Sequence, residues 1–227
     1  MYTIPLQAIV LYLISGYLHR SLSSISKILY ILLMLPGTIA HETSHALAAL
    51  LMGSRITEFS VIPSGDTLGH VEYTAPKIPI IGNVAISIAP LIGCPVILLL
   101  MSSYFGVYFG LHPGSFDILT ETRFLLDGTH SFITGLDYLS WKTYLFLYFA
   151  LTLGAGAAPS RTDIITMLPG LVVIVTAFYA LNYFGVKIQY LDIIFSSLSA
   201  SLSIAIIPLL AVAVIIGILE LITIVRP

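Results

Sequence analysis

The chain has 227 residues, of which 58% are hydrophobic and only 9% are charged, and its formal net charge is −2. Soluble globular domains carry roughly 25% charged residues, so this composition excludes an ordinary soluble domain. The small net charge gives no reason to expect a nucleic-acid partner. The composition is typical of a single domain of packed membrane helices over residues 1–227. The one cysteine, Cys94, excludes an intrachain disulfide and a cysteine-based zinc cluster.

Six apolar segments are interpreted as transmembrane helices. No basic stretch precedes the first segment, which favours a first membrane helix over a cleaved signal peptide. A straight span needs about 20 residues, so the first and fourth segments are short. The third is long enough to contain a break, which Pro90 and Pro95 are expected to supply. The segments cover approximately residues 4–18, 28–53, 79–110, 142–158, 163–184 and 189–219.

Two polar stretches separate these apolar segments. Residues 55–76 are rich in β-formers on both sides of a Pro-Ser-Gly-Asp turn sequence, which predicts a short β-hairpin or small sheet. Residues 111–141 are the one substantial polar loop, and they could fold as a short amphipathic element at the surface.

His41, Glu42 and His45 form the pattern H-E-x-x-H inside the second apolar segment. With six His and five Glu in 227 residues, chance would produce this pattern roughly 0.003 times. On a helix the two imidazoles lie one turn apart on one face and can bind one Zn²⁺, with the glutamate beside the catalytic water. Three such side chains in an apolar helix cost several kcal/mol unless a partner, metal or water satisfies them. We therefore interpret the pattern as a metal site, with Glu42 as the catalytic general base, rather than as a pair of core histidines.

A catalytic zinc usually has three protein ligands and a water, so a third ligand is needed. Asp163 is the candidate, because it lies near the start of the fifth apolar segment, on the side where the H-E-x-x-H helix ends. Gly154 and Gly156 before it allow close packing between membrane helices. The alternative is that Asp163 caps the next helix, with Ser160 or Thr162 sharing that role.

The stretch that begins at His41 resembles the site-2 protease family of intramembrane zinc metalloproteases. The next helix is similar to a family helix with small residues four apart, here Ala89 and Gly93. Pro159 and Asp163 match the family's third-ligand motif, although the asparagine before it and the glycine after it are absent here. The chain is therefore identified as a divergent member. The matching residues of the first motif are His41, Glu42, His45, Ala49, Gly53, Ile56, Phe59, Pro63 and Gly65.

The resemblance implies an all-α polytopic membrane protein with about six transmembrane helices and a small β-hairpin or sheet after the H-E-x-x-H helix. It implies hydrolysis of a peptide bond in a transmembrane or membrane-proximal segment of a protein substrate. One Zn²⁺ per chain would be held by His41, His45 and Asp163, with Glu42 as general base. The partners implied are the lipid bilayer and a membrane protein or peptide substrate. The expected location is the cell membrane, with the active site toward the cytosolic side.

Two other functions stay open on the sequence. One is a membrane zinc hydrolase that processes another peptide or a lipidated protein. The other is a non-enzymatic metal-binding membrane protein or transporter, although transport does not need the H-E-x-x-H spacing and no inverted repeat is visible. The sequence assigns no substrate-binding residue and no oligomeric state. An edge strand within residues 56–75 could hold an unwound substrate by strand addition, and His70 is either a substrate or metal contact or a surface histidine.

Overall fold

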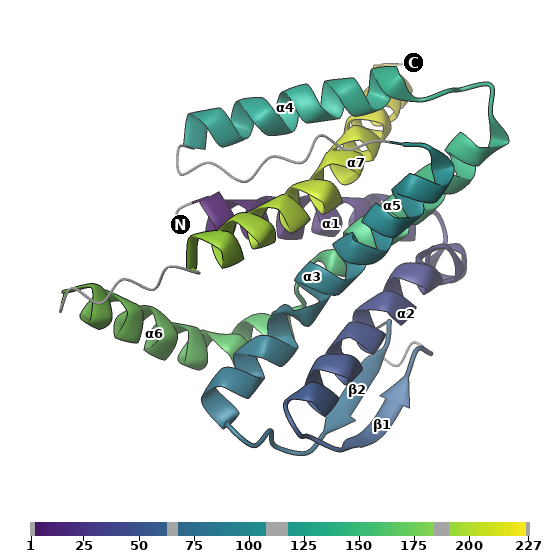
Figure 1. The fold of residues 1–227 in the computed structure, drawn as a ribbon. Coiled ribbons are helices and arrows are strands. Elements are labelled where there is room, and N and C mark those ends of the chain that lie inside the picture. Colours follow the sequence, from purple (N-terminus) through teal and green to yellow (C-terminus); the bar gives the residue numbers. More distant parts are fainter. Residues whose placement is uncertain (1–2, 63–67, 108–117, 184–190, 226–227) are drawn as a thin grey trace.

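A computed structural model describes residues 3–62, 68–107, 118–183 and 191–225 (Figure 1). Six of the helices in this part of the chain correspond to the six predicted apolar segments. The remaining helix, α4, lies in the stretch predicted to be a polar loop with a short amphipathic element. The elements of the described residues are α1 (Thr3–Ile25), α2 (Lys27–Leu51), β1 (Ile56–Ser60), β2 (His70–Tyr73), α3 (Pro79–Phe105), α4 (Ile118–Gly135), α5 (Trp141–Ala157), α6 (Arg161–Tyr183) and α7 (Leu191–Val225).

The helices α2, α3 and α5 pack against one another and form the centre of the molecule (Figure 1). The helix α7 closes this group on another side, against α3 and α5, while α1 packs mainly on α7 and α6 packs on α3. Fully buried apolar side chains fill the interior, among them Leu98 of α3, Phe146 of α5, and Ile206 and Leu209 of α7. The core therefore lies between helices that are distant in the sequence.

The helix α4 lies across α7 at one end of the molecule (Figure 1). Phe132 and Thr129 are buried on one face of α4, whereas Arg123, Asp127 and His130 are exposed on the other. This division confirms the predicted amphipathic element and shows that it is a helix of 18 residues. The flanking residues 111–117 of the predicted loop lie outside the described residues.

The helix α3 is continuous from Pro79 to Phe105, so the break predicted at Pro90 and Pro95 is wrong. Both prolines are buried inside the helix. Each proline removes one backbone hydrogen bond, but neighbouring helices in a membrane bundle can satisfy the group that it frees. A proline therefore need not end a helix that is surrounded by protein.

The predicted β-hairpin is confirmed as a two-stranded antiparallel sheet. Phe59 of β1 lies opposite Val71 of β2, and Ser60 lies opposite His70. The turn at residues 63–67 lies outside the described residues. The hairpin follows α2 directly and both strands pack against that helix, so the sheet lies next to the H-E-x-x-H residues (Figure 1).

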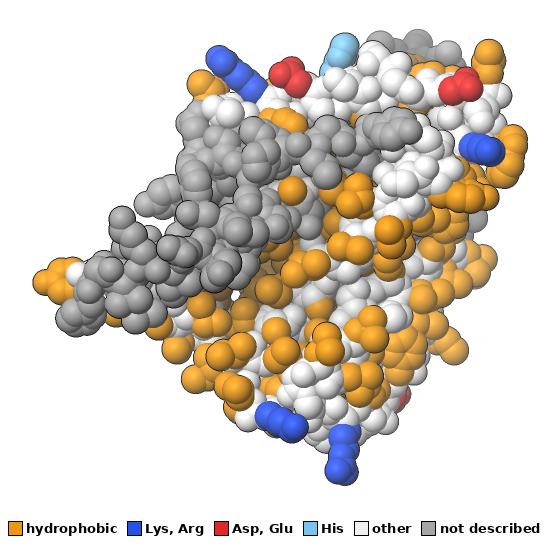
Figure 2. Space-filling view, viewed as in Figure 1, with side chains coloured by type: hydrophobic (Ala, Val, Ile, Leu, Met, Phe, Trp, Pro, Cys, Tyr) orange, Lys and Arg blue, Asp and Glu red, His pale blue; other side chains and the backbone are white. Residues whose placement is uncertain are grey.

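Among the described residues, two helical segments are long and apolar enough to cross a membrane, namely α3 and Leu198–Ile222 of α7. The helix α5 and residues Arg161–Ala177 are bent by 49° and make a third if they count as one broken span. Six crossings are therefore not confirmed. The face in Figure 2 carries Lys and Arg side chains at its two ends and hydrophobic side chains between them, as expected of a protein embedded in a bilayer.

Glycines allow α2 and α5 to approach closely. A Cβ atom on Gly37 of α2 would lie 1.9 Å from the carbonyl oxygen of Thr152, and one on Gly156 of α5 would lie 2.6 Å from the carbonyl oxygen of Gly37. Gly154 faces α7 in the same way, with a Cβ position 2.8 Å from Leu209 Cγ. The prediction that Gly154 and Gly156 permit close helix packing is therefore confirmed.

We predict that Gly37→Ala destabilises the protein, because the added methyl group meets backbone rather than a movable side chain. Overpacking of this kind typically costs about 1–3 kcal/mol. Gly16→Ala in α1 is the matched control, since no heavy atom lies within 4 Å of its Cβ position and alanine is the better helix former. Thermal unfolding in detergent should show a lower Tm for Gly37→Ala and an unchanged or higher Tm for Gly16→Ala. Equal Tm values for the two variants would contradict the close contact.

Candidate metal centre

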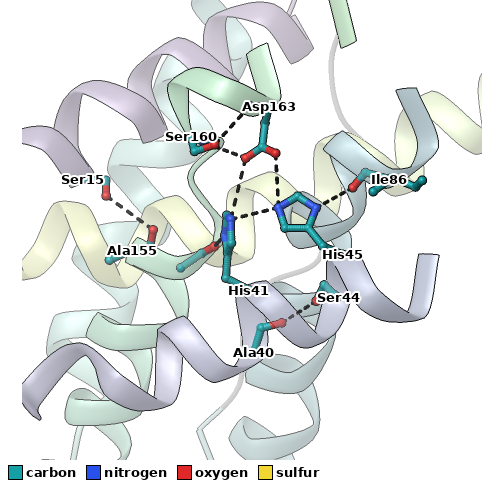
Figure 3. Close-up of polar contacts among 10 residues, drawn as sticks. Ser15, Ala40, His41, Ser44, His45, Ile86, Ala155, Ser160 and Asp163 are labelled. Carbon is teal, nitrogen blue, oxygen red and sulfur yellow. Dashed lines mark hydrogen bonds and ion pairs between the residues drawn. The ribbon is translucent and has the colours of Figure 1, made fainter. Parts of the chain in front are cut away.

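The H-E-x-x-H residues lie on one helix, as predicted, in the second half of α2. Glu42 and His45 are buried, and His41 is partly buried. The two imidazoles point away from α2 toward the start of α6, where Asp163 reaches back toward them (Figure 3). Gly37 lies one turn before His41 on the same face of α2, so the close contact with α5 occurs directly beside the site.

The structure brings together His41, His45 and Asp163. Each offers one ligand atom, and these atoms all lie within 4.8 Å of one another. The Nε2 atoms of His41 and His45 are 3.0 Å apart. Asp163 Oδ1 lies 3.2 Å from Nε2 of His45, and its Oδ2 lies 3.7 Å from Nε2 of His41. Ligand atoms about 2.0–2.1 Å from a tetrahedral zinc are about 3.4 Å apart, so this spacing suits that ion.

Backbone carbonyls hold both imidazoles from behind. Nδ1–H of His41 donates to the carbonyl oxygen of Gly156 at 2.6 Å. Nδ1–H of His45 donates to the carbonyl oxygen of Ile86 at 2.8 Å (Figure 3). A neutral imidazole with its proton on Nδ1 has a lone pair on Nε2. Two such lone pairs that face each other at 3.0 Å repel unless a cation lies between them. The residues therefore fit a metal ion, and the carbonyls are the outer partners that orient metal-binding histidines.

Asp163 forms the helix cap that the sequence left as one alternative, and its position also permits the other. The helix α6 begins at Arg161, which makes Ser160 the residue that caps it. Asp163 N–H donates to Ser160 Oγ at 3.1 Å, and Ser160 N–H donates to Asp163 Oδ2 at 2.8 Å, which is a reciprocal capping box. The other oxygen, Oδ1, faces His45. The capping role of Asp163 is thus observed. The cap leaves Oδ1 available to a metal ion, and the role of Asp163 as a metal ligand stays a prediction.

Glu42 lies beside a cavity of about 670 Å³ that also contains the three candidate ligands. The walls come from α1, α2, β2, the end of α5 and the start of α6. Gly69, directly before β2, lies against Glu42, because a Cβ atom there would be 2.9 Å from Glu42 Cγ. The hairpin therefore covers the glutamate on one side, while the cavity leaves room for a substrate on the other.

Tyr73 of β2 is partly buried and lines this cavity. Burial raises the pKa of its phenol above the usual range, and the negative charge of Asp163 adds to that rise. The phenol therefore stays protonated at neutral pH and can donate a hydrogen bond to a group that enters the cavity.

His70 is not one of the residues that come together as candidate metal ligands. Its Nε2 lies 3.0 Å from Glu58 Oε1 across the hairpin, where about a third of the His70 side chain is exposed. It also borders the cavity, so a metal contact is not supported and a substrate contact stays a prediction.

Sequence reasoning missed the outer partners of the site and one wall of the cavity. The cap itself was not missed, because Ser160 was one of two residues predicted to share the capping role of Asp163. The carbonyls of Gly156 and Ile86 carry no sequence signal, because every residue has a carbonyl. The contribution of α1 to the cavity depends on how that helix packs, which its sequence does not reveal.

We predict about one zinc per chain in the wild type and much weaker zinc binding in Asp163→Asn. The amide oxygen of asparagine can still accept the Ser160 N–H, so this variant keeps the cap and loses the negative charge. A zinc affinity at least 100-fold lower is expected, because loss of an outer partner alone costs about 10–100-fold. Metal analysis and titration against a competing chelator measure both values.

Ser160→Ala is the matched control for the capping role. It removes the cap hydroxyl and should cost about 1 kcal/mol of stability, while zinc binding stays close to that of the wild type. Wild-type zinc affinity in Asp163→Asn would show that Asp163 is only a cap.

Comparison with known proteins supports this assignment. The family model described as Peptidase M50B-like matches residues 6–105, a stretch that holds His41, Glu42 and His45 and ends before Asp163. Neither the search of curated proteins nor the search of solved structures found a match. The family match over residues 6–105 confirms the resemblance to site-2 proteases for that part of the chain.

Proposed function

We propose that this protein is an intramembrane zinc metalloprotease that hydrolyses a peptide bond in a transmembrane or membrane-proximal segment of a protein substrate. The observation that carries the proposal is the group formed by His41, His45 and Asp163 beside Glu42, in a cavity between membrane helices. The family match supports the same activity. Metal storage or transport would not need a buried carboxylate on the same helix face as the two histidines.

One zinc ion would be held by His41, His45 and Asp163. When bound, the ion polarises a carbonyl group and makes water acidic enough to serve as a nucleophile near neutral pH. Glu42 accepts a proton from the water whose oxygen attacks the substrate carbonyl carbon. Glu42 then gives that proton to the amide nitrogen as the carbon–nitrogen bond breaks. The products are a new carboxyl end and a new amino end.

A substrate helix hides its amides, because its backbone groups are bonded to one another in the bilayer. Cleavage therefore requires the helix to unwind near the cavity. The strand β2 contributes His70, Val71 and Tyr73 to the cavity, so it is the strand that could pair with an unwound substrate. Pairing by strand addition would replace the helical hydrogen bonds that the substrate loses.

We predict that Glu42→Gln abolishes cleavage of a model transmembrane substrate while zinc binding is kept. Glutamine has nearly the same shape but cannot accept the proton from water, and general base catalysis contributes about 10²–10⁴-fold. Product analysis by mass spectrometry measures cleavage and locates the bond, and metal analysis measures zinc in the same preparations. Asp127→Asn, on the exposed face of α4 and outside the cavity lining, is the control for removal of a carboxylate.

The outcomes separate the candidate functions. Cleavage inside the helical segment by the wild type alone supports an intramembrane endopeptidase. Cleavage only of short or lipidated peptides would favour a different membrane zinc hydrolase. Wild-type activity in Glu42→Gln, or a zinc-loaded wild type without hydrolysis of any of these substrates, would rule out the proposal.

We further propose that the hairpin side of a multi-pass chain faces the cytosol of the cell membrane, as the family resemblance implies. The helix α2 has 25 residues and is therefore about 37 Å long. In the proposed orientation α2 crosses the bilayer, whose apolar core is about 30 Å thick, and the hairpin and the start of α2 lie near its opposite surfaces.

Cysteine labelling tests this orientation, because the only native cysteine, Cys94, is buried. In intact cells or right-side-out vesicles, a membrane-impermeant maleimide should label Ser24→Cys, which is exposed near the start of α2. Glu58→Cys on the hairpin should react only in inverted vesicles or after permeabilisation. The reverse pattern would place the hairpin outside, and equal labelling of both positions from one side would show that α2 does not cross the bilayer.

A further inference from the structure

The carbonyl that orients His45 comes from the interior of a helix, where carbonyls normally accept a hydrogen bond from the same helix. In an α-helix the carbonyl of residue 86 accepts the N–H of residue 90. Residue 90 is a proline and has no N–H. The Ile86 oxygen in the continuous helix α3 has therefore lost its helical donor, and Nδ1–H of His45 donates to it instead at 2.8 Å.

The proline has a second effect on the same carbonyl. A proline ring inside a helix collides with the carbonyl four residues earlier and pushes it outward. Pro90 is fully buried and Ile86 is 1% exposed, so bulk water does not reach this part of α3. A buried carbonyl without a donor is unfavourable, and an outward tilt directs the oxygen toward the neighbouring helix α2. His45 is the residue of α2 that supplies the missing donor.

The other histidine receives its carbonyl by a different route. Gly156 is the second-to-last residue of α5, which ends at Ala157. The last four carbonyls of a helix have no helical donor, so the Gly156 oxygen is available to His41 without any proline. Both imidazoles thus donate to carbonyls that lack a helical donor. The first carbonyl lies at the end of α5, and the second lies inside α3, where Pro90 removes the donor.

We propose that Pro90 is a positioning residue of the metal centre. By removing the N–H at residue 90, it keeps the Ile86 carbonyl available to hold His45 with its proton on Nδ1 and its Nε2 directed at the metal. This inference rests on the proposed function in that it needs a metal at the site. It goes beyond that function by assigning a role to an apolar side chain that is not a ligand.

A second proline in α3 provides a matched control. Pro95 is also buried in the same helix, and it leaves the carbonyl of Leu91 without its helical donor in the same way. Neither metal-site histidine bonds to that carbonyl, since Nδ1 of each is bonded to Gly156 or Ile86. Pro90→Ala and Pro95→Ala therefore remove the same ring and restore the same kind of N–H, but only the first acts on His45.

The experiment measures zinc affinity of the full-length protein in detergent by competition with a chelator. The visible absorption spectrum of the Co²⁺-loaded protein reports the ligand geometry without any substrate. Pro90→Ala should bind zinc about 10–100-fold more weakly, the usual effect of losing an outer partner, and its Co²⁺ spectrum should change. Pro95→Ala should match the wild type in both measurements, and thermal unfolding of the metal-free proteins shows whether the two variants fold equally well.

Wild-type zinc affinity in Pro90→Ala, or an equal loss in Pro95→Ala, would overturn the proposal while leaving the metalloprotease function intact. If Pro90→Ala does not fold, Pro90→Val and Pro95→Val, which restore the N–H with a larger apolar side chain, carry the same expectations. A wild-type chain that binds no zinc would overturn this inference together with the proposed function, so the two failures are distinguishable.

Discussion

Two imidazoles and two carboxylates lie close together among apolar helices, and most of the polar contacts around them compensate for that burial. Polar groups buried away from water are costly unless hydrogen bonds or a metal satisfy them. His41 and His45 each donate to a backbone carbonyl, and Asp163 accepts from the backbone of Ser160. These bonds leave Nε2 of both histidines and Oδ1 of Asp163 facing one another at the centre of the group, and these are the atoms that a metal ion would bind.

The close packing of α2 against α5 makes this compensation possible. Gly37 and Gly156 have no side chains, so the end of α5 reaches α2 within one turn of His41. The same end of α5 leads through Pro159 into α6, whose first turn carries Asp163. A single close contact between helices therefore sets the position of one outer carbonyl and of the third candidate ligand. A bulkier residue at Gly37 would move both away from the histidines.

The arrangement also explains how a hydrolytic site can exist in an apolar protein. The cavity lies between α1, α2, β2 and the α5–α6 junction, so the candidate metal ligands border an open space rather than solid core. The hairpin lies against Glu42 through Gly69 and offers a strand at the cavity. If an unwound substrate pairs with β2, the carbonyl groups of the substrate lie near Glu42 and the candidate metal ligands.

Sequence reasoning succeeded where a local pattern carries the information. H-E-x-x-H on a helix, the hairpin after it and the extent of the fourth apolar segment, residues 142–158, all depend on residues close together in the sequence. It failed at Pro90 and Pro95, because α3 continues through both prolines. At Pro90 the freed carbonyl of Ile86 accepts a hydrogen bond from His45 of the neighbouring helix. It also predicted six crossings from apolarity alone, and the described helices do not confirm that number.

The sequence by itself determined that this is a helical membrane protein with two histidines and a glutamate on one helix face, because composition and helical period are local properties. It could not decide between the two roles of Asp163, since a cap and a ligand need the same residue type at the same place. Only the tertiary structure showed that one carboxylate oxygen completes the cap while the other faces His45. Packing likewise decided which backbone carbonyls orient the two histidines. Every residue has a carbonyl, and only the approach of another helix brings a particular one within hydrogen-bond distance of an imidazole.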